Sequence, residues 1–273
     1  MRKFIYILAF VVGFSEPLIA QEIPALGSAY AIAMGGSGIN PTNIWSITQN
    51  VAIQPSYSGL FIGSNYARGY IQEQGRYNLI GGFTGHKFTL SSFYQYYGFS
   101  EYHSQSAALN YSQQLSQKFS AGVSLRYHLA SMPKLNKQKS LLSYHLAIYY
   151  QLSSTFAAGV QFQQPALGIF DGSAILKKDQ GFRFSLCYQQ QDKAFNLQSH
   201  AVYLSEFEQL RLQIGVDLRV HEQWRIQTGT STHPFTPGFG FTWHALPINL
   251  AFSSGYHPQL GFLPSVSIAY ASK

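Results

Sequence analysis

Residues 119–129 read Phe-Ser-Ala-Gly-Val-Ser-Leu-Arg-Tyr-His-Leu, and residues 210–220 read Leu-Arg-Leu-Gln-Ile-Gly-Val-Asp-Leu-Arg-Val. In both stretches apolar side chains occupy every second position. A β-strand points successive side chains to opposite faces, so each stretch has one apolar and one polar face. In a soluble sandwich the apolar face would form the core, whereas in a membrane barrel it faces lipid and the polar face lines the lumen. The rest of the chain decides between these two folds.

The composition favours contact with lipid. Only 11% of the residues are charged and 16% are aromatic, whereas about 25% are charged in ordinary soluble domains. Few charges and many aromatic side chains suit a lipid-facing wall with aromatic belts at the interfaces. The formal net charge of +7 is consistent with anionic lipid head groups as partners, or with solubilising charge in the loops. Nucleic acid is not an expected partner of an exported chain.

The N-terminus reads as a secretory signal peptide, residues 1–20. Arg2 and Lys3 form a basic start, the apolar run 4–14 follows, and Ala20 is a plausible cleavage point. The run is too short to span a bilayer as a helix. We therefore expect export, with the mature chain inserted in a bacterial outer membrane as a barrel.

The alternation recurs along the chain and predicts fourteen strands, most of about ten residues, the length that a tilted strand needs to cross hydrocarbon. The predicted strands are 57–66, 75–83, 86–96, 105–113, 118–130, 139–151, 155–164, 181–190, 194–204, 208–220, 222–231, 236–244, 246–254 and 262–271. The predicted fold class is all-β, a 14-stranded antiparallel transmembrane β-barrel. The barrel domain spans residues 56–273.

Short and long connections alternate between these strands, as in barrels with short periplasmic turns and longer outer loops. Tight turns are expected near Thr84, Leu115, Ser153, Asp192, His221 and Pro247. Longer connections are expected at 67–74, 97–104, 131–138, 165–180, 231–235 and 255–261, with 205–208 as a short exception. Aromatic residues follow five of the tight turns and predict an inner aromatic girdle at Phe88, Phe119, Phe156, Phe195 and Trp224.

Residues 21–55 do not alternate and are rich in small side chains. We expect them to form a plug inside the barrel, because a barrel of this size has an interior wider than its own side chains fill. Gly35, Gly36 and Gly38 would allow tight turns and close backbone approach, and Trp45 would anchor the plug on the inner wall. A phosphate-binding loop is not expected, since its lysine and its strand–helix context are missing.

Both ends of the mature chain resemble a known family. The segment Ala31-Ile-Ala-Met-Gly-Gly-Ser-Gly38, with Trp45 and then Asn50-Val51-Ala52, resembles the N-terminus of the PorV/PorQ group. So do the later stretches 229–234 and 256–261. These proteins are outer-membrane barrels of Bacteroidetes, related in fold to the FadL fatty-acid transporters. The resemblance implies a 14-stranded barrel with an N-terminal plug. It also implies either passive transport of hydrophobic molecules or an accessory role in type IX secretion. Val51 replaces the usual proline of the family.

Alternation places a set of polar side chains in the lumen. The candidates are Arg126, His128, Arg183, Arg211, Asp217, Arg219 and Arg225. Lumenal side chains tune what passes through a barrel, so a basic lining could favour carboxylate-bearing ligands such as fatty acids. Alternatively, these arginines pair with Asp217 and with oxygens of the plug and serve rigidity alone.

Two adjacent glycines, Gly81 and Gly82, lie within the second predicted strand. Glycine inside a strand can mark a bulge or a kink. The resemblance to FadL-like barrels, in which a strand kink opens a sideways exit to the membrane, allows a similar gap here. The other interpretation is a packing contact between these glycines and the plug.

No sequence pattern indicates catalysis or a cofactor. The single cysteine, Cys187, excludes an intramolecular disulfide, and His128 and His145 lack the further ligands of a metal site. A lipid hydrolase would need a Ser–His pair, and no nucleophile-elbow motif is present. The preferred function is therefore FadL-like passive transport of small hydrophobic or amphipathic molecules. The alternative is a type IX secretion scaffold that binds exported proteins or other membrane subunits.

Overall fold

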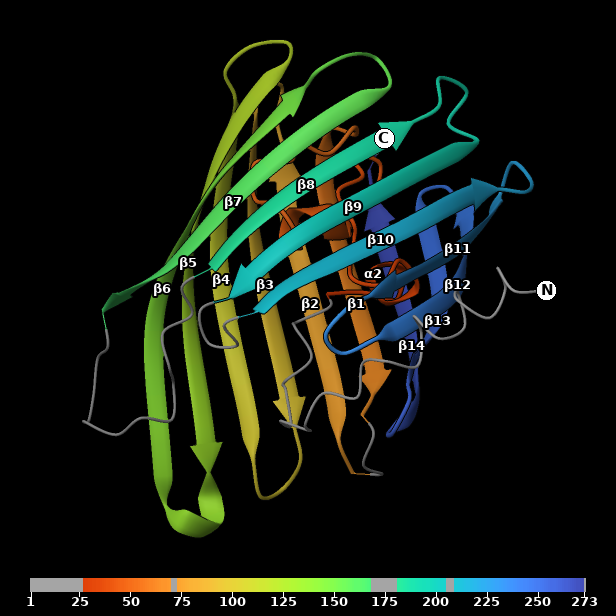
Figure 1. The fold of residues 1–273 in the computed structure, drawn as a ribbon. Coiled ribbons are helices and arrows are strands. Elements are labelled where there is room, and N and C mark those ends of the chain that lie inside the picture. The colour runs from red at the N-terminus through yellow and green to blue at the C-terminus, as the bar shows by residue number, and fades with distance from the viewer. Residues whose placement is uncertain (1–26, 70–72, 168–180, 205–208, 273) are drawn as a thin grey trace, which may run out of the picture.

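The computed structural model describes residues 27–69, 73–167, 181–204 and 209–272. The predicted signal peptide and the first residues of the predicted plug lie outside the described residues. Fourteen antiparallel strands close into a single barrel (Figure 1), in which each strand pairs with its neighbours in sequence and β1 pairs with β14. The closing ladder runs from Phe61 opposite Ala271 to Ala67 opposite Ser265. The predicted fold class is confirmed.

The strands lie within a few residues of their predicted positions. They are β1 (Gly59–Arg68), β2 (Gly75–Thr84), β3 (Phe88–Gly98), β4 (His103–Gln114), β5 (Phe119–Met132), β6 (Lys137–Gln151), β7 (Phe156–Leu167), β8 (Gly181–Gln189), β9 (Phe195–Leu204), β10 (Gln209–Arg219), β11 (Trp224–Ser231), β12 (Thr236–Ala245), β13 (Ile248–His257) and β14 (Gly261–Ala271). The described helical elements are α2 (Ala29–Ala33), η1 (Ile44–Thr48) and η2 (Pro133–Leu135). None of these helical elements has the length and apolar character needed to cross a membrane.

The outer connections are shorter than predicted. The loops expected at 97–104 and 131–138 shrink to 99–102 and 133–136. The reason is that strand pairing continues to the very end of each hairpin, with Gly98 opposite His103 and Met132 opposite Lys137. Polar residues that looked like loop in the sequence are therefore paired strand.

The apolar face of the wall points outward. Along β1 the side chains of Leu60 and Ile62 are exposed. Phe61, which lies between them, and Asn65, further along the strand, are buried. An exterior of exposed leucine, isoleucine and aromatic side chains on a closed sheet is typical of a wall that faces lipid. The predicted inner girdle residues contact further rings at the same end of the barrel, including Phe119 with Tyr150 and Trp224 with Trp243.

The residues 27–55, called here the lumenal segment, lie inside the ring of strands (Figure 1). Its helix α2 begins at Ser28, whose side chain accepts a hydrogen bond from the Ala31 N–H. Asn43 caps η1 in the same way through the Trp45 N–H. Because almost every residue of this segment is buried, the interior of the barrel is the core of the molecule.

The lipid-facing wall generates a stability prediction. Leu109 lies near the middle of β4 and its side chain is 65% exposed. We expect Leu109→Arg to lower the free energy of unfolding by about 2–4 kcal/mol, because a charge at the bilayer midplane loses its hydration. Urea-induced unfolding from lipid vesicles measures this value. Phe262→Arg, one residue from the end of β14, is the control and should cost only about 0–1 kcal/mol. Equal costs at both positions would argue against a transmembrane wall.

Candidate functional site

Four inward-facing wall glycines form a flat seat for the lumenal segment. This glycine seat consists of Gly215, Gly229, Gly238 and Gly240 on β10–β12. A Cβ atom on Gly229 would lie 2.3 Å from the Met34 carbonyl carbon, and one on Gly238 would lie 2.1 Å from the Ile32 carbonyl oxygen. Any larger residue would collide with the backbone of the segment, so the end of α2 packs directly on the wall.

The glycines of the segment itself turn the chain after α2. Gly35 and Gly36 have φ angles of 64° and 94°, which L side chains rarely adopt. The Gly38 N–H then donates to Nε2 of His200 at 3.4 Å. The three glycines predicted to belong to the plug therefore lie at the turn that leads from the glycine seat towards β9.

Wall side chains that the sequence analysis missed hold the backbone of the segment. Ser and Gln side chains on the inner wall form hydrogen bonds with its N–H and C=O groups. Buried backbone polar groups need such partners. The hydrogen bonds are Ala29 N–H to Ser267 Oγ at 2.7 Å, Ile39 N–H to Gln198 Oε1 at 2.7 Å, Val51 N–H to Gln161 Oε1 at 3.0 Å, and Ser120 Oγ–H to the Ala52 carbonyl at 2.6 Å. Inward-facing glutamines next to a buried non-alternating segment are the signal that could have identified these contacts.

Trp45 and Asn50 anchor the second half of the segment. Trp45 is buried in an apolar cluster with Ile44, Ile47 and wall residues of β1–β4 and β14. Asn50 is fully buried and donates through Nδ2 to the Ile148 carbonyl at 3.2 Å. The same side chain accepts the Ala52 N–H at 2.9 Å. Asn50 therefore links the segment to β6 while it turns its own backbone.

A polar network joins α2 to β10 and β11. Asp217 accepts Nε–H of Arg225 at 2.9 Å and the Gln227 amide at 3.1 Å. The Tyr30 hydroxyl donates to the same carboxylate at 3.4 Å. Burial, and then the charge of Asp217, raise the pKa of Tyr30 well above its usual value. The Tyr30 hydroxyl therefore remains a proton donor to Asp217.

The predicted lumenal arginines divide into three groups. Arg225 is paired with Asp217, and Arg183 bonds oxygens of the lumenal segment, both as the rigidity interpretation expected. Arg126, Arg183 and Arg211 face inward on β5, β8 and β10 and form what we call the basic sector. Arg219 differs from the prediction, because it is the last residue of β10 and lies exposed at the rim, where it donates to the Asp192 carbonyl at 2.7 Å.

Each arginine of the basic sector has a different contact. The Arg126 guanidinium lies over the Phe93 ring at 5.8 Å, and Nε of Arg211 donates to the His233 carbonyl at 2.7 Å. Arg183 donates through Nη1 to both the backbone carbonyl and the side-chain Oε1 of Gln49, at 2.7 and 2.8 Å. Arg126 and Arg211 act on Arg183 as neighbouring like charges. The sector is therefore a positively charged part of the inner wall.

Three buried polar atoms around Arg183 have no hydrogen-bond partner among the described residues. They are Nε of Arg183, Oγ of Ser185 and Nδ1 of His200. Ser185 lies two positions from Arg183 on the same face of β8, and His200 lies directly opposite Ser185 on β9. A buried group left without a partner costs about 1–3 kcal/mol. This part of the wall therefore has unused capacity to bind polar atoms.

The histidines do not form a catalytic or metal centre in the described part of the chain. His128 faces the lumen, as predicted, and so does His145 on the neighbouring strand. No three described His, Cys, Asp or Glu side chains lie together as metal ligands would. The hydroxyls of Ser124 and Ser185 lie opposite His145 and His200, and neither hydroxyl has a hydrogen-bond partner among the residues that the structure describes.

An apolar patch lies on the inner wall at β1–β4, across the barrel from Arg183 and Arg211 and next to Arg126. Phe61, Ile80, Phe93 and Ala108 point inward from β1–β4 and pack against η1 of the lumenal segment. We call these four residues the apolar sector. The lumen therefore has an apolar patch that suits hydrocarbon, and arginines beside and across from it that suit anions.

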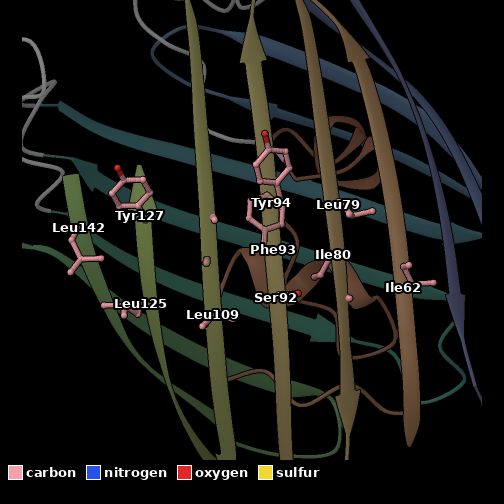
Figure 2. A pocket seen from close by; sticks show the side chains of 13 residues that line it. Ile62, Leu79, Ile80, Ser92, Phe93, Tyr94, Leu109, Leu125, Tyr127 and Leu142 are labelled. Atoms are coloured by element: carbon pink, nitrogen blue, oxygen red, sulfur yellow. The ribbon is translucent and has the colours of Figure 1, made fainter. Parts of the chain in front are cut away.

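A groove of about 510 Å³ lies on the outer face of the same strands. Its floor is formed by small outward-facing residues on adjacent strands, Gly81, Ser92 and Ala107, of which Gly81 lies directly opposite Ser92 and Ala107 lies opposite Tyr94. Figure 2 shows the bulky side chains around the outer groove on β1–β6 and the lumenal segment behind the strands. These bulky residues are Ile62, Leu79, Tyr94, Leu109, Leu125, Tyr127 and Leu142.

The outer groove and the apolar sector lie on opposite faces of the same strands. Ile80, Phe93 and Ala108 point into the lumen and also line the outer groove. This contact is possible because the residues between them on the outer face are too small to cover the backbone. The wall at β2–β4 thus carries apolar side chains towards both the lumen and the outer groove.

The predicted kink at Gly81 and Gly82 is replaced by continuous strand pairing. Gly81 lies opposite Ile62 and Ser92, and Gly82 lies opposite Phe61 and Ser91, without a register shift. A Cβ atom on Gly82 would lie 2.6 Å from the Phe61 ring, whereas one on Gly81 would meet only a carbonyl oxygen at 3.7 Å. Gly82 therefore serves interior packing against Phe61, and Gly81 deepens the outer groove.

No protein-family model and no curated protein matches the sequence. Solved structures with a similar fold include the CymD monoaromatic hydrocarbon channel, with a TM-score of 0.67 and 11% identity over 91% of this chain and 98% of that chain. The Pseudomonas putida toluene transporter TodX has a TM-score of 0.62 and 11% identity over 89% and 97%. A Pseudomonas aeruginosa FadL homologue has a TM-score of 0.57 and 10% identity over 89% and 98%.

The closed barrel with an apolar exterior and these likenesses define a transmembrane β-barrel with the FadL-like fold. The fold relation that the N-terminal motifs implied is therefore confirmed. The neighbours are transport channels rather than enzymes. The narrower resemblance to the PorV/PorQ group of Bacteroidetes stays a prediction.

The glycine seat generates a test of how the segment is held. Gly229→Ala places a methyl group where the Met34 backbone lies, so we expect the lumenal segment to leave its seat while the strands stay paired. Faster cleavage of the segment by added protease, with unchanged heat-modifiable migration of the barrel, would report this displacement. Gly81→Ala is the matched control, since its methyl group meets no side chain. Equal protease sensitivity of both variants would contradict direct packing of the lumenal segment's backbone on the glycine seat.

Proposed function

We propose that the protein is a passive channel of a bacterial outer membrane for small hydrophobic or amphipathic molecules. The observation that carries this proposal is the apolar sector of the lumen, which lies back to back with the apolar outer groove across β2–β4. Apolar surface on both faces of the same strands provides contacts for a hydrophobic molecule in the lumen and at the membrane side of the wall. The proposal is supported by fold neighbours whose names describe hydrocarbon and toluene transport.

The lumenal segment acts as the plug in this function. It fills the interior, and its attachments consist of hydrogen bonds and glycine contacts that can be broken without breaking a strand ladder. An apolar molecule that enters from outside would displace or pass the segment along the apolar sector. From there the hydrocarbon of the membrane is the nearest apolar phase, beyond the floor of the outer groove.

The basic sector adds selectivity for anionic head groups. Arg183 on β8 and Arg211 on β10 lie across the barrel from the apolar sector, and Arg126 on β5 borders it. A molecule with an apolar tail and a carboxylate would therefore find a complementary surface at each end. Medium-chain fatty acids have this chemistry. A PorV/PorQ-like scaffold role in type IX secretion gains no comparable support, because the described outer connections are short.

Uptake measurements test the function. In an outer-membrane host that lacks its own channels for hydrophobic compounds, we expect the protein to raise the uptake of radiolabelled decanoate above the empty-vector level. The uptake of a disaccharide should not change, because the buried lumenal segment occupies the interior of the barrel. Decanoate uptake at the vector level, by a protein shown to be folded in the membrane, would refute the proposal.

The outer groove provides a variant that separates transport from folding. Gly81→Leu fills the floor of the groove without touching the interior, so we expect decanoate uptake to fall several-fold at an unchanged amount of folded barrel. Thr228→Leu places the same side chain on the outer face of β11, outside the groove, and should leave uptake unchanged. A similar loss in both variants would show that the groove has no special part in transport.

A further inference from the structure

We propose that Gln49 is an internal pseudo-ligand, whose oxygens occupy the position on Arg183 that the carboxylate of an amphipathic cargo takes. Cargo binding would then compete directly with the attachment of the lumenal segment to the wall. This inference rests on the proposed function for the class of cargo. It adds how the cargo releases the plug.

The first support is the contact itself. Nη1 of Arg183 donates to two oxygens of one residue, the backbone carbonyl and the side-chain Oε1 of Gln49, at 2.7 and 2.8 Å. Two oxygens within hydrogen-bond distance of a guanidinium are what a carboxylate also presents. The oxygens of Gln49 are uncharged, so they solvate the cation without neutralising it. A carboxylate would make stronger, charge-assisted hydrogen bonds at the same place.

The second support is that Gln49 uses only part of the hydrogen-bonding capacity of the Arg183 guanidinium. Nε of Arg183 remains without a partner among the described residues, and so do the Ser185 hydroxyl and Nδ1 of His200 beside it. Nε2 of His200 already accepts the Gly38 N–H, so in the neutral ring Nδ1 carries the proton and is a donor. The site therefore offers further donors to a ligand with more acceptor capacity than an amide.

The third support is the charge around the site. The two ion pairs recorded for the described residues are Lys134 with Glu101 and Arg225 with Asp217, and Arg183 takes part in neither. Arg126 and Arg211 add like charge to its surroundings. A buried cation normally has a counter-charge. Among the described residues no carboxylate pairs with Arg183, which is held by neutral oxygens, and this favours an anion as a further partner.

The position of Gln49 links the site to the plug. Gln49 directly follows η1, whose Ile44, Trp45 and Ile47 pack on the apolar sector, and it precedes the anchor residue Asn50. Loss of the Gln49 contact would therefore loosen the segment between its two anchors. The apolar sector that η1 covers is the surface that the tail of the cargo would need.

Binding measurements on the purified full-length barrel test the proposal. The probes are octanoate and 1-octanol, which share a chain length and differ in the head group, and calorimetric titration in detergent gives both affinities. We expect octanoate to bind more tightly than 1-octanol. Arg183→Gln should weaken octanoate binding by about tenfold or more, as expected for a hydrogen bond to a charged group, and leave 1-octanol unchanged. Arg219→Gln, at the exposed rim, is the control for charge and should change neither affinity.

Gln49→Ala gives the decisive outcome, because it removes the side-chain oxygen of the competitor. We expect octanoate to bind this variant several-fold more tightly than the wild type. Gln54→Ala is the matched control, since Gln54 bonds the same segment to Thr89 and Ser112 instead of Arg183, and it should leave octanoate affinity unchanged. Unchanged or weaker octanoate binding in Gln49→Ala, or equal loss of both probes in Arg183→Gln, would overturn the proposal.

A second measurement keeps the test independent of folding defects and of transport. Trp45 lies in η1, and in a Trp224→Phe, Trp243→Phe background its emission reports displacement of the segment. Octanoate should shift this emission and 1-octanol should shift it less; an equal response to both probes would count against the competition. If Arg183→Gln fails to fold, the comparison of Gln49→Ala with Gln54→Ala decides alone. Normal octanoate competition without decanoate uptake would refute the proposed transport and leave the pseudo-ligand intact.

Discussion

The structure depends on how a closed sheet fills its own interior. Fourteen strands enclose more space than their inward side chains occupy, so a stretch of chain has to lie in the lumen with its backbone polar groups satisfied. The wall meets this need in two ways. Glycines on β10–β12 let the backbone of residues 32–35 lie directly on the sheet, and serine and glutamine side chains on the other strands bond the rest.

The division of the lumen into two sides follows from the same strands that make the wall. Inward positions of β1–β3 carry Phe61, Ile80 and Phe93 beside one arginine, Arg76, whereas inward positions of β5, β8 and β10 carry three arginines. The lumenal segment matches both sides, with η1 on the apolar sector and the Gln49 oxygens on Arg183. The segment therefore reproduces inside the barrel the tail-and-head chemistry of an amphipathic molecule.

Period-two alternation was enough to predict the strand number, the closed topology and the inward direction of Arg126, Arg183, Arg211, Asp217 and Arg225, because side-chain direction in a strand depends on sequence position alone. The lengths of the outer loops could not be predicted, since polar residues at strand ends pair as readily as apolar ones. The contacts of Gln49, Gln161 and Gln198 could not be predicted either. They depend on where the lumenal segment meets the wall, and no local pattern encodes that distance between residues far apart in the chain.

The ladder between β1 and β14 has a consequence for assembly. Ser267 and Asn65 share a hydrogen bond across this seam although 202 positions separate them in sequence, and every other ladder joins strands adjacent in the chain. Such a non-local pairing forms slowly because a very long loop has to close first. Until the last strand arrives, the growing sheet has two unpaired edges, which are templates for aggregation. The nascent chain therefore needs protection, by a chaperone or by the membrane itself, until its final hairpin has been delivered.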